Sequence, residues 1–322
     1  MTEGIPYIEA LRQAASAKLD CPADSLRLER CGAGKYNAAY FLEGWREPLV
    51  LRVAPADERR LNLYYEHRMM RQEPGLHRKI LASTSVPVPE IVAFDFSREL
   101  LERDFLLMKK VPGVPLSEAP GVSRKEFERV LGEVGQALRQ IHAICGDGYG
   151  YLGEHRPMEP QGDWTSAFVV MWDNLLEDIR LCGGYSGAEA DALRRLLEAN
   201  LGLFDRQAPA SLLHMDVWAQ NILIGNAGRL TGLLDWDRAL YGDPEIEFAV
   251  LDYCGFSEPA FWEGYGTSRE DDSGARKRRV FYLLYELQKY IFIRRVRGKN
   301  PALAGSYRQQ SLQLAAALGL SI

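Results

Sequence analysis

The sequence contains little cysteine, and its cysteines form no recognisable site. The five residues are scattered, odd in number and without a C-x-x-C pair (Cys21, Cys31, Cys145, Cys182 and Cys254). We therefore expect neither a disulfide framework nor a zinc site, and we expect a reducing, cytoplasmic setting.

Long apolar runs are also missing. The first residues, MTEGIPYIEALRQ, lack the basic stretch and the apolar block of a signal peptide. The most apolar segment, residues 280–293, contains Glu286, Gln288 and Lys289 and is too short to span a bilayer. We expect a buried helix there and no membrane partner.

Positive charge is not in excess. The chain carries 39 Lys and Arg against 44 Asp and Glu, which gives a net charge of −5. A general nucleic-acid binder needs a basic surface to replace the counterions of the phosphates, so this balance argues against that class. The mild acidity is compatible with a cationic small substrate.

The patterns that are present predict two lobes within 322 residues. Apolar residues at helical spacing open the chain, strand-like runs follow as far as residue 111, and a helix is expected over residues 57–84, which Pro74 breaks or restarts. After Pro115 the pattern is mainly helical, with short strands at 222–224 and 230–234. We expect an α+β fold with a small antiparallel sheet lobe and a larger helical lobe, residues 1–111 and 112–322.

The strongest functional signal is a set of polar residues placed after two apolar runs. Asp216 and Asn221 stand five residues apart after the run SLLHM, and Asp235 lies at the end of the second run. Asp and Asn are common in ordinary turns, so only the combination is informative. A carboxylate, an amide and a second carboxylate in this order suit phosphoryl transfer. The first orients or deprotonates a hydroxyl, and the other two hold the Mg²⁺ ion at the nucleotide phosphates.

These segments resemble the aminoglycoside phosphotransferase and related small-molecule kinase superfamily, which shares the protein-kinase-like fold. The HxDxxxxN loop of that superfamily is matched by HMDVWAQN, and its DxD motif by DWD. The resemblance implies that Asp216 is the catalytic carboxylate and that Asn221 and Asp235 bind the metal. It assigns supporting roles in the loop to His214 and Asp237.

The chain departs from the pattern of the superfamily at two positions. Members often carry Gly where Met215 stands, and Asp where Glu247 stands in the segment after Gly-Asp-Pro. The longer Glu247 adds one methylene to a side chain that is expected to brace the catalytic loop.

A protein kinase has the same catalytic parts but differs in the segment after them. Its metal-binding Asp precedes a long regulatory loop that ends in A-P-E. Here only seven residues separate Asp235 from Asp243, and Pro244 then begins a predicted helix. We therefore do not expect a protein substrate.

The N-terminal lobe is expected to bind the nucleotide. A glycine-containing turn with Gly32, Gly34 and Asn37 lies between two strands, where backbone N–H groups can approach phosphates. Hairpin turns often contain Gly, so the turn is informative only together with the motifs later in the chain.

The resemblance places a phosphate-binding cation at Arg52, in the run VLRV, where Lys is the commoner residue. Arginine stays charged and can engage two oxygens at once, so the role is retained. The partner of this cation is expected to be a helical Glu. Spacing to the VPVP segment favours Glu73, and Glu66 is the alternative.

The run LLMKKVPG is expected to connect the two lobes. The resemblance places adenine against it, with the Lys109 carbonyl and the Val111 N–H as hydrogen-bonding groups and Met108 behind the ring. Core packing accounts for Met108 equally well.

The acceptor site is not assigned to individual residues by the sequence. Four acidic residues could bind a polyamine, although each could equally form an ion pair at the protein surface (Asp173, Glu177, Asp178 and Asp252). Aromatic residues at helical spacing could line the site or pack in the core (Trp164, Phe168, Trp172, Trp262 and Tyr265). His142 is interpreted as a packed structural histidine.

We predict a cytoplasmic kinase that uses Mg²⁺ and ATP (or GTP) to phosphorylate a hydroxyl of a small molecule, an aminoglycoside-like or other amino-sugar compound. A fructosamine-type kinase is the first alternative, because Trp218 and the segment YGDPEIEFAVLDYCGF resemble that branch. Homoserine, choline and macrolide kinases also remain open. The hypothesis from another class is a degenerate kinase-fold binding module, favoured by Arg52 and Pro74 and opposed by the retained catalytic set.

Overall fold

The computed structural model describes residues 5–32, 36–55, 59–151, 153 and 155–320. The chain divides into two compact units, each made of separate stretches of sequence. Unit 1 contains Met1–Glu58, Arg68–Pro120 and Gln220–Asp237, and unit 2 contains Arg59–His67, Gly121–Ala219 and Arg238–Ile322.

This division differs from the single boundary after residue 111 that the sequence predicts. The physical reason is a hairpin of residues 222–233, which pairs with residues 114–115. In addition, the backbone N–H of Leu233 donates to the carbonyl of Pro87 at 2.8 Å. Backbone hydrogen bonds therefore attach this segment to unit 1, although it lies far along the chain.

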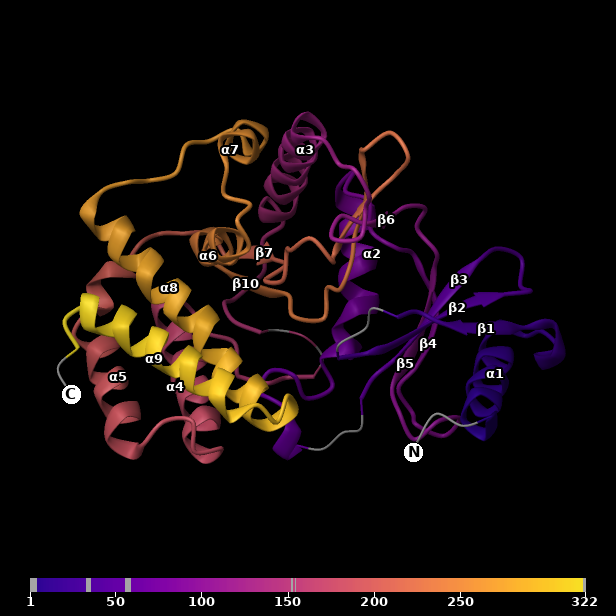
Figure 1. The fold of residues 1–322 in the computed structure, drawn as a ribbon, viewed down its shortest axis with the longest axis horizontal. Coiled ribbons are helices and arrows are strands. Elements are labelled where there is room, and N and C mark those ends of the chain that lie inside the picture. Colours follow the sequence, from indigo (N-terminus) through magenta and orange to yellow (C-terminus); the bar gives the residue numbers. More distant parts are fainter. Residues whose placement is uncertain (1–4, 33–35, 56–58, 152, 154, 321–322) are drawn as a thin grey trace. The chain divides into compact units, whose positions relative to one another are not determined.

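The sheet of unit 1, whose strands are labelled in Figure 1, is antiparallel. Its strand order is β1-β2-β3-β5-β4. Helix α1 spans Ile5–Leu19, where the apolar spacing predicts it, and packs Leu11 and Ala15 into the core beside Tyr40 and Leu51. The strands are β1 (Arg27–Arg30), β2 (Ala38–Glu43), β3 (Leu49–Val53), β4 (Ile91–Asp95) and β5 (Phe105–Lys109).

The helix expected over residues 57–84 is wrong in extent. Helix α2 spans only Glu73–Ser83, and the described residues before it form turns and the short 3₁₀ helices η2 (Arg59–Leu61) and η3 (Met69–Gln72). Pro74 lies in the first turn of α2, where its missing N–H removes no intrahelical bond. It therefore starts the helix and does not interrupt a longer one.

A second, three-stranded sheet of unit 1 consists of β6 (Val114–Pro115), β8 (Ile222–Ile224) and β9 (Leu230–Leu233). Gly113 precedes it at φ +132°, and a Cβ atom there would lie 2.8 Å from the carbonyl oxygen of Ile224. Glycine is thus required for this close approach. Ile222 pairs with Leu233, so β8 begins where β9 ends.

Unit 2 is mainly helical, and its helix starts show capping chemistry. Ser123 and Glu126 form a reciprocal capping box at α3, and Ser186 and Glu189 form another at α5. The helices are α3 (Arg124–His142), α4 (Trp164–Leu181), α5 (Gly187–Glu198), α6 (Pro244–Cys254), α7 (Pro259–Tyr265), α8 (Ser273–Phe292) and α9 (Pro301–Ala317). Short elements complete the described chain: η1 (Ala23–Ser25), η4 (Leu201–Leu203), the π-helical turn η5 (Ile293–Arg297), and the paired strands β7 (Ser211–Leu213) and β10 (Leu240–Gly242).

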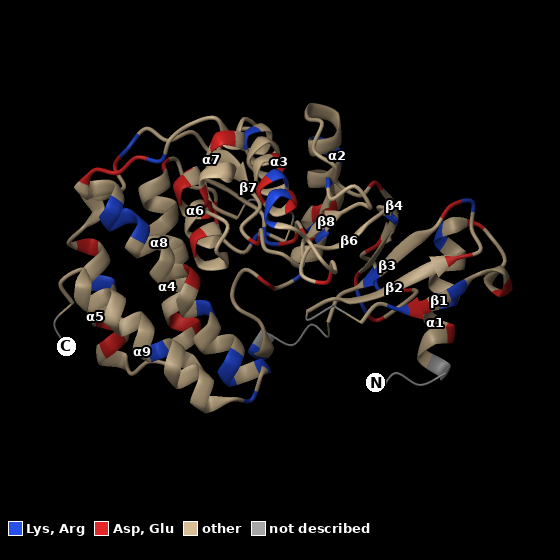
Figure 2. Ribbon diagram, turned by 45° about the horizontal axis from the view of Figure 1, so that its top comes forward, with Lys and Arg blue, Asp and Glu red and all other residues tan. Residues whose placement is uncertain are grey.

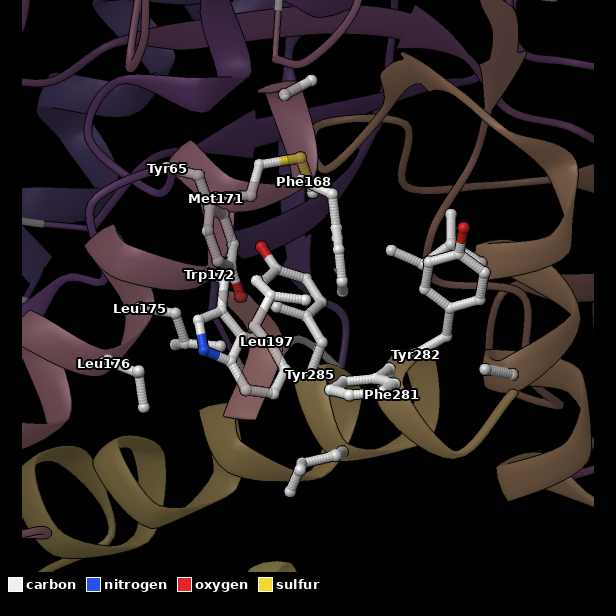
Figure 3. Close-up of a cluster of buried hydrophobic side chains, with 14 of the residues drawn as sticks. Tyr65, Phe168, Met171, Trp172, Leu175, Leu176, Leu197, Phe281, Tyr282 and Tyr285 are labelled. Atoms are coloured by element: carbon white, nitrogen blue, oxygen red, sulfur yellow. The ribbon is translucent and has the colours of Figure 1, made fainter. Parts of the chain in front are cut away.

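The core of unit 2 is rich in aromatic side chains from α4 and α8 (Figure 3). Trp164, Phe168 and Trp172 are at most 2% exposed, so of the two interpretations of these residues the structure supports core packing. Trp262 and Tyr265 pack against Phe248 in a second aromatic group. Residues 280–293 fall largely within α8, as expected for a buried helix. Among the helices in the described ranges, none has the length and apolar character needed to cross a membrane.

Candidate active site

Arg52 on β3 lies among three carboxylates within unit 1. Its Nη1 atom is 2.5 Å from Oε2 of Glu73, while Nη2 contacts Asp235 and lies 3.4 Å from Oδ2 of Asp237. Arg52 is 8% exposed and Glu73 is completely buried. A buried guanidinium with this many anionic partners is held in a fixed position.

The structure therefore pairs Arg52 with Glu73, the first residue of α2, and gives the alternative residue other partners. Glu66 belongs to unit 2, where it accepts the backbone N–H of Leu63 at 2.8 Å. It also lies 2.9 Å from Arg297.

Charge and burial act against each other in this cluster. Burial lowers the pKa of Arg52, but the charges of Glu73, Asp235 and Asp237 outweigh it, and the pKa of Arg52 rises. Burial, together with the charges of Asp235 and Glu73, raises the pKa of Asp237 well above its ordinary value. Three carboxylates thus share one guanidinium, and a further cation would be favourable beside them.

The same carboxylates offer oxygens to a divalent cation. Ligand oxygens of Glu73, Asp235 and Asp237 all lie within 4.8 Å of one another. Asn221 precedes β8, and its carbonyl accepts the N–H of Leu234, the residue before Asp235. The strand pairing therefore places the predicted metal-binding amide and carboxylate at the same end of the β8–β9 hairpin, and an all-oxygen set of this kind fits Mg²⁺.

Asp237 is braced from two sides. Asn37 donates from Nδ2 to Oδ2 of Asp237 at 2.8 Å, and Gln72 donates to its backbone carbonyl. Gln72 has no role in the sequence analysis, and its position just before α2 gives no signal of this contact. Gly32 is exposed, and a Cβ atom added there would meet nothing within 4 Å, whereas Gly34 lies outside the described residues.

The residues expected to contact adenine lie on β5 or just after it. Met108 is 5% exposed and packs with Met70 and Leu106. The Nζ atom of Lys109 lies 2.9 Å from Oε2 of Glu90 and 3.2 Å from Oε1 of Glu47. Val111 comes after the strand and is partly exposed.

In unit 2, the predicted catalytic loop begins where β7 ends and is held by one buried carboxylate. Glu247 on α6 accepts the backbone N–H groups of His214 at 3.1 Å and of Met215 at 2.6 Å. His142 lies 2.9 Å from the same carboxylate. Nδ1 of His214 in turn accepts the N–H of Asp216 at 3.3 Å. The extra methylene of Glu247 does not prevent the brace, and His142 is part of it.

Two residues of the motifs adopt the left-handed backbone conformation. Met215 has φ 63° and Asp235 has φ 69°. This conformation costs a non-glycine residue about 1 kcal/mol, which explains why a glycine at the position of Met215 would suit the loop. The brace by Glu247 and the complete burial of Met215 offset that cost here.

We expect Glu247→Gln to lower the free energy of unfolding by about 3 kcal/mol, because it removes one charge of a buried pair. Burial raises the pKa of Glu247, but the hydrogen bond and charge of His142 outweigh it, so the folded-state pKa lies below its ordinary value of 4.5. The stabilisation is therefore complete above about pH 4.5 and is lost as the pH falls through the folded-state pKa. Urea unfolding at pH 3 to 7 measures this dependence. The free energy of unfolding should fall less steeply with decreasing pH in the variant than in the wild type. Glu263→Gln, at an exposed position of α7, is the control and should match the wild type.

A buried ionic network beside the predicted catalytic loop was not predicted from the sequence. Arg238 donates from Nη1 to the carbonyl of Met215 at 2.6 Å and from Nη2 to Glu286 at 2.8 Å. Lys289 contacts the same Glu286. The sequence does contain one indication of this network. Glu286 and Lys289 carry opposite charges three residues apart within the apolar segment of residues 280–293.

Comparison with known proteins agrees with this architecture. Residues 27–281 match the model of the phosphotransferase enzyme family. The chain is 25% identical over 310 residues to hygromycin-B 4-O-kinase of Escherichia coli, a match that covers 92% of this chain and 73% of that protein. It is 23% identical over 271 residues to a protein of Vibrio parahaemolyticus described as a probable ketoamine kinase, covering 80% and 83% of the two chains.

A solved structure shares the fold. It is a thermostable mutant of aminoglycoside phosphotransferase APH(4)-Ia in a ternary complex with ADP and hygromycin B. The TM-score is 0.67 at 19% identity, over 97% of this chain and all of the other. The chain therefore belongs to the phosphotransferase enzyme family and is a small-molecule kinase with the protein-kinase-like fold.

Proposed function

We propose that this protein transfers the γ-phosphate of ATP, or of GTP, to a hydroxyl of an amino-sugar compound. The observation that carries the proposal is the ordered catalytic loop, in which a buried Glu247 holds the backbone on the N-terminal side of Asp216. Preorganisation of this kind is what phosphoryl transfer asks of a protein, since positioning and electrostatics supply most of the rate.

Each predicted site residue has a role in the proposal. Asp216 accepts the proton of the acceptor hydroxyl, and Asn221 and Asp235 hold Mg²⁺. When bound, this ion neutralises charge on the phosphates of the nucleotide. Arg52, oriented by Glu73, contacts the phosphates, and the turn with Gly32, Gly34 and Asn37 covers them. His214 and Asp237 support the loop, while Met108, Lys109 and Val111 contact the adenine.

A ketoamine is the second candidate acceptor. It is favoured by the similarity to a probable ketoamine kinase over 80% of the chain. Both candidate acceptors are sugars that carry an amine, so the same reaction on a hydroxyl serves either one.

A panel of acceptors tests the proposal. Release of ADP should depend on an acceptor and on Mg²⁺, and ³¹P NMR should show a phosphate monoester with hygromycin B or with a fructosyl amine. EDTA should abolish turnover. Nucleotide binding in a thermal-shift titration without turnover of any acceptor would instead identify a binding module.

A further inference from the structure

Three tyrosines from three helices of unit 2 form a cluster that the roles above leave unused. They are Tyr253 on α6, Tyr290 on α8 and Tyr307 on α9, whose helices are labelled in Figure 1. The ring centroid of Tyr290 lies 5.6 Å from that of Tyr253 and 5.1 Å from that of Tyr307. The hydroxyls of Tyr253 and Tyr307 are 3.1 Å apart.

The cluster is partly open to solvent. Tyr253 is 39% exposed, and Tyr290 and Tyr307 are partly buried. The aromatic side chains of the unit 2 core shown in Figure 3 are almost completely buried by comparison. Exposed aromatic rings with hydroxyl groups are suited to binding a ligand that has both apolar and polar surface.

A continuous series of contacts joins the cluster to the catalytic loop. The ammonium of Lys289 lies 5.0 Å from the ring centroid of Tyr290 and contacts Glu286. Glu286 binds Arg238 at 2.8 Å, and Arg238 binds the carbonyl of Met215, which precedes the proposed catalytic carboxylate.

The electrostatics agree with this proximity. Burial is the largest cause that raises the pKa of Tyr290, and the charges of Glu286 and Asp216 raise it further. Burial is likewise the largest cause that raises the pKa of Cys254, the last residue of α6, and the charges of Glu286 and Asp216 raise it further. The charge of Asp216 therefore acts on the central ring of the cluster and on the residue that follows Tyr253.

The buried carboxylate of Glu286 beside the cluster already has two cationic partners. Arg238 lies 2.8 Å from Glu286, and Lys289 contacts the same carboxylate. The charge of Glu286 is therefore compensated within the protein itself.

The four acidic residues that the sequence offered for a polyamine are engaged by the protein itself. Asp252 binds Arg269 through two contacts of 2.7 Å, and Asp178 accepts the N–H of Tyr64 at 2.6 Å. Asp173 lies 3.5 Å from Arg194, and Glu177 binds Arg180. Figure 2 shows the same mixing, with blue and red segments interspersed over the helices of this unit.

We propose that Tyr253, Tyr290 and Tyr307 bind a ring of the acceptor, and that the acceptor is a sugar compound with at most one amine rather than a polyamine. This inference rests on the proposed function and narrows its substrate. The apolar C–H face of a sugar ring can pack on an aromatic side chain while its hydroxyls bond to the phenol groups. Each additional ammonium of a polyamine would need its own carboxylate to compensate for lost hydration.

Steady-state kinetics of the full-length chain test the proposal. We expect Tyr253→Ala to raise the acceptor KM about tenfold, which corresponds to about 1.4 kcal/mol, with kcat and the KM for ATP changed less than about twofold. Tyr307→Phe, which removes only a hydroxyl, should raise the acceptor KM by a smaller factor. Phe94→Ala is the control: Phe94 is an exposed ring that stacks on Phe96 in unit 1, and its loss should leave the acceptor KM unchanged.

The wild type should also turn over a fructosyl amine with a higher kcat/KM than a polyamine aminoglycoside such as kanamycin. A higher kcat/KM for the polyamine, or unchanged acceptor KM values in both tyrosine variants, would overturn this inference and leave the proposed function intact. A fall in kcat for Tyr253→Ala together with equal changes in both KM values would show a purely structural role. Absence of turnover with every acceptor would instead contradict the proposed function.

Discussion

Asp216→Ala is expected to reduce kcat by about 10³-fold while the affinity for nucleotide stays within about twofold of the wild type. The reason is that the proposed proton acceptor is lost, whereas the residues assigned to the phosphates and the metal remain. Single-turnover kinetics measure the chemical step, and a fluorescent nucleotide analogue measures binding. Asp216→Asn should be equally slow, because the amide keeps the shape of the side chain but cannot accept the proton.

The matched control is Asp205→Ala, which removes an exposed carboxylate from the same unit. It should retain full activity, since a solvated side chain contributes little to structure or chemistry. Undiminished turnover by Asp216→Ala would refute the assignment of the catalytic carboxylate. A comparable loss in the control variant would point to a general effect on the fold.

Arg52→Met is expected to lower the free energy of unfolding by about 3–5 kcal/mol and to abolish measurable turnover. The substitution leaves Glu73 buried without its guanidinium partner, and it removes the cation proposed to contact the phosphates. Burial by itself raises the pKa of Glu73, but the charge of Arg52 together with His77 outweighs it, so the pKa is lowered in the wild type. The variant should therefore lose stability most strongly at neutral pH, where Glu73 would have to be ionised without its guanidinium partner.

A double variant separates the two effects. Arg52→Met combined with Glu73→Leu removes the guanidinium and the most buried of its three carboxylate partners, so urea unfolding should recover part of the lost stability while activity stays absent. Arg27→Met is the control, because it also removes an arginine from a strand, here the exposed strand β1. It should change neither the free energy of unfolding nor the activity. Activity restored in the double variant would show that Arg52 acts only through stability.

Local patterns in the chain predict most of the elements, and they fail where the backbone depends on distant contacts. Helix α1 and strands β1, β2 and β3 lie where the sequence patterns place them, and α1, β2 and β3 each bury apolar side chains in the core of unit 1. The helix expected over residues 57–84 shortens to α2, since the preceding residues take turns and a left-handed conformation at Arg68. Periodicity carries no information about such turns.

The candidate site shows the same contrast. The spacing of Asp216, Asn221 and Asp235 is a property of the local sequence and identifies them as a motif. By contrast, nothing near Glu286 in the sequence identifies Arg238 as its partner, because 48 residues separate them along the chain.

By itself, the sequence predicted the class of reaction, since the motif of Asp216, Asn221 and Asp235 is local and its order is typical of phosphoryl transfer. Tertiary structure alone decided that Glu73 rather than Glu66 meets Arg52, and that Glu247 and His142 brace the catalytic loop. It also decided that Arg238 and Lys289 both pair with Glu286. Each of these depends on which buried charges meet after the chain has packed, and buried charges are stable only when paired with partners that sequence spacing does not specify.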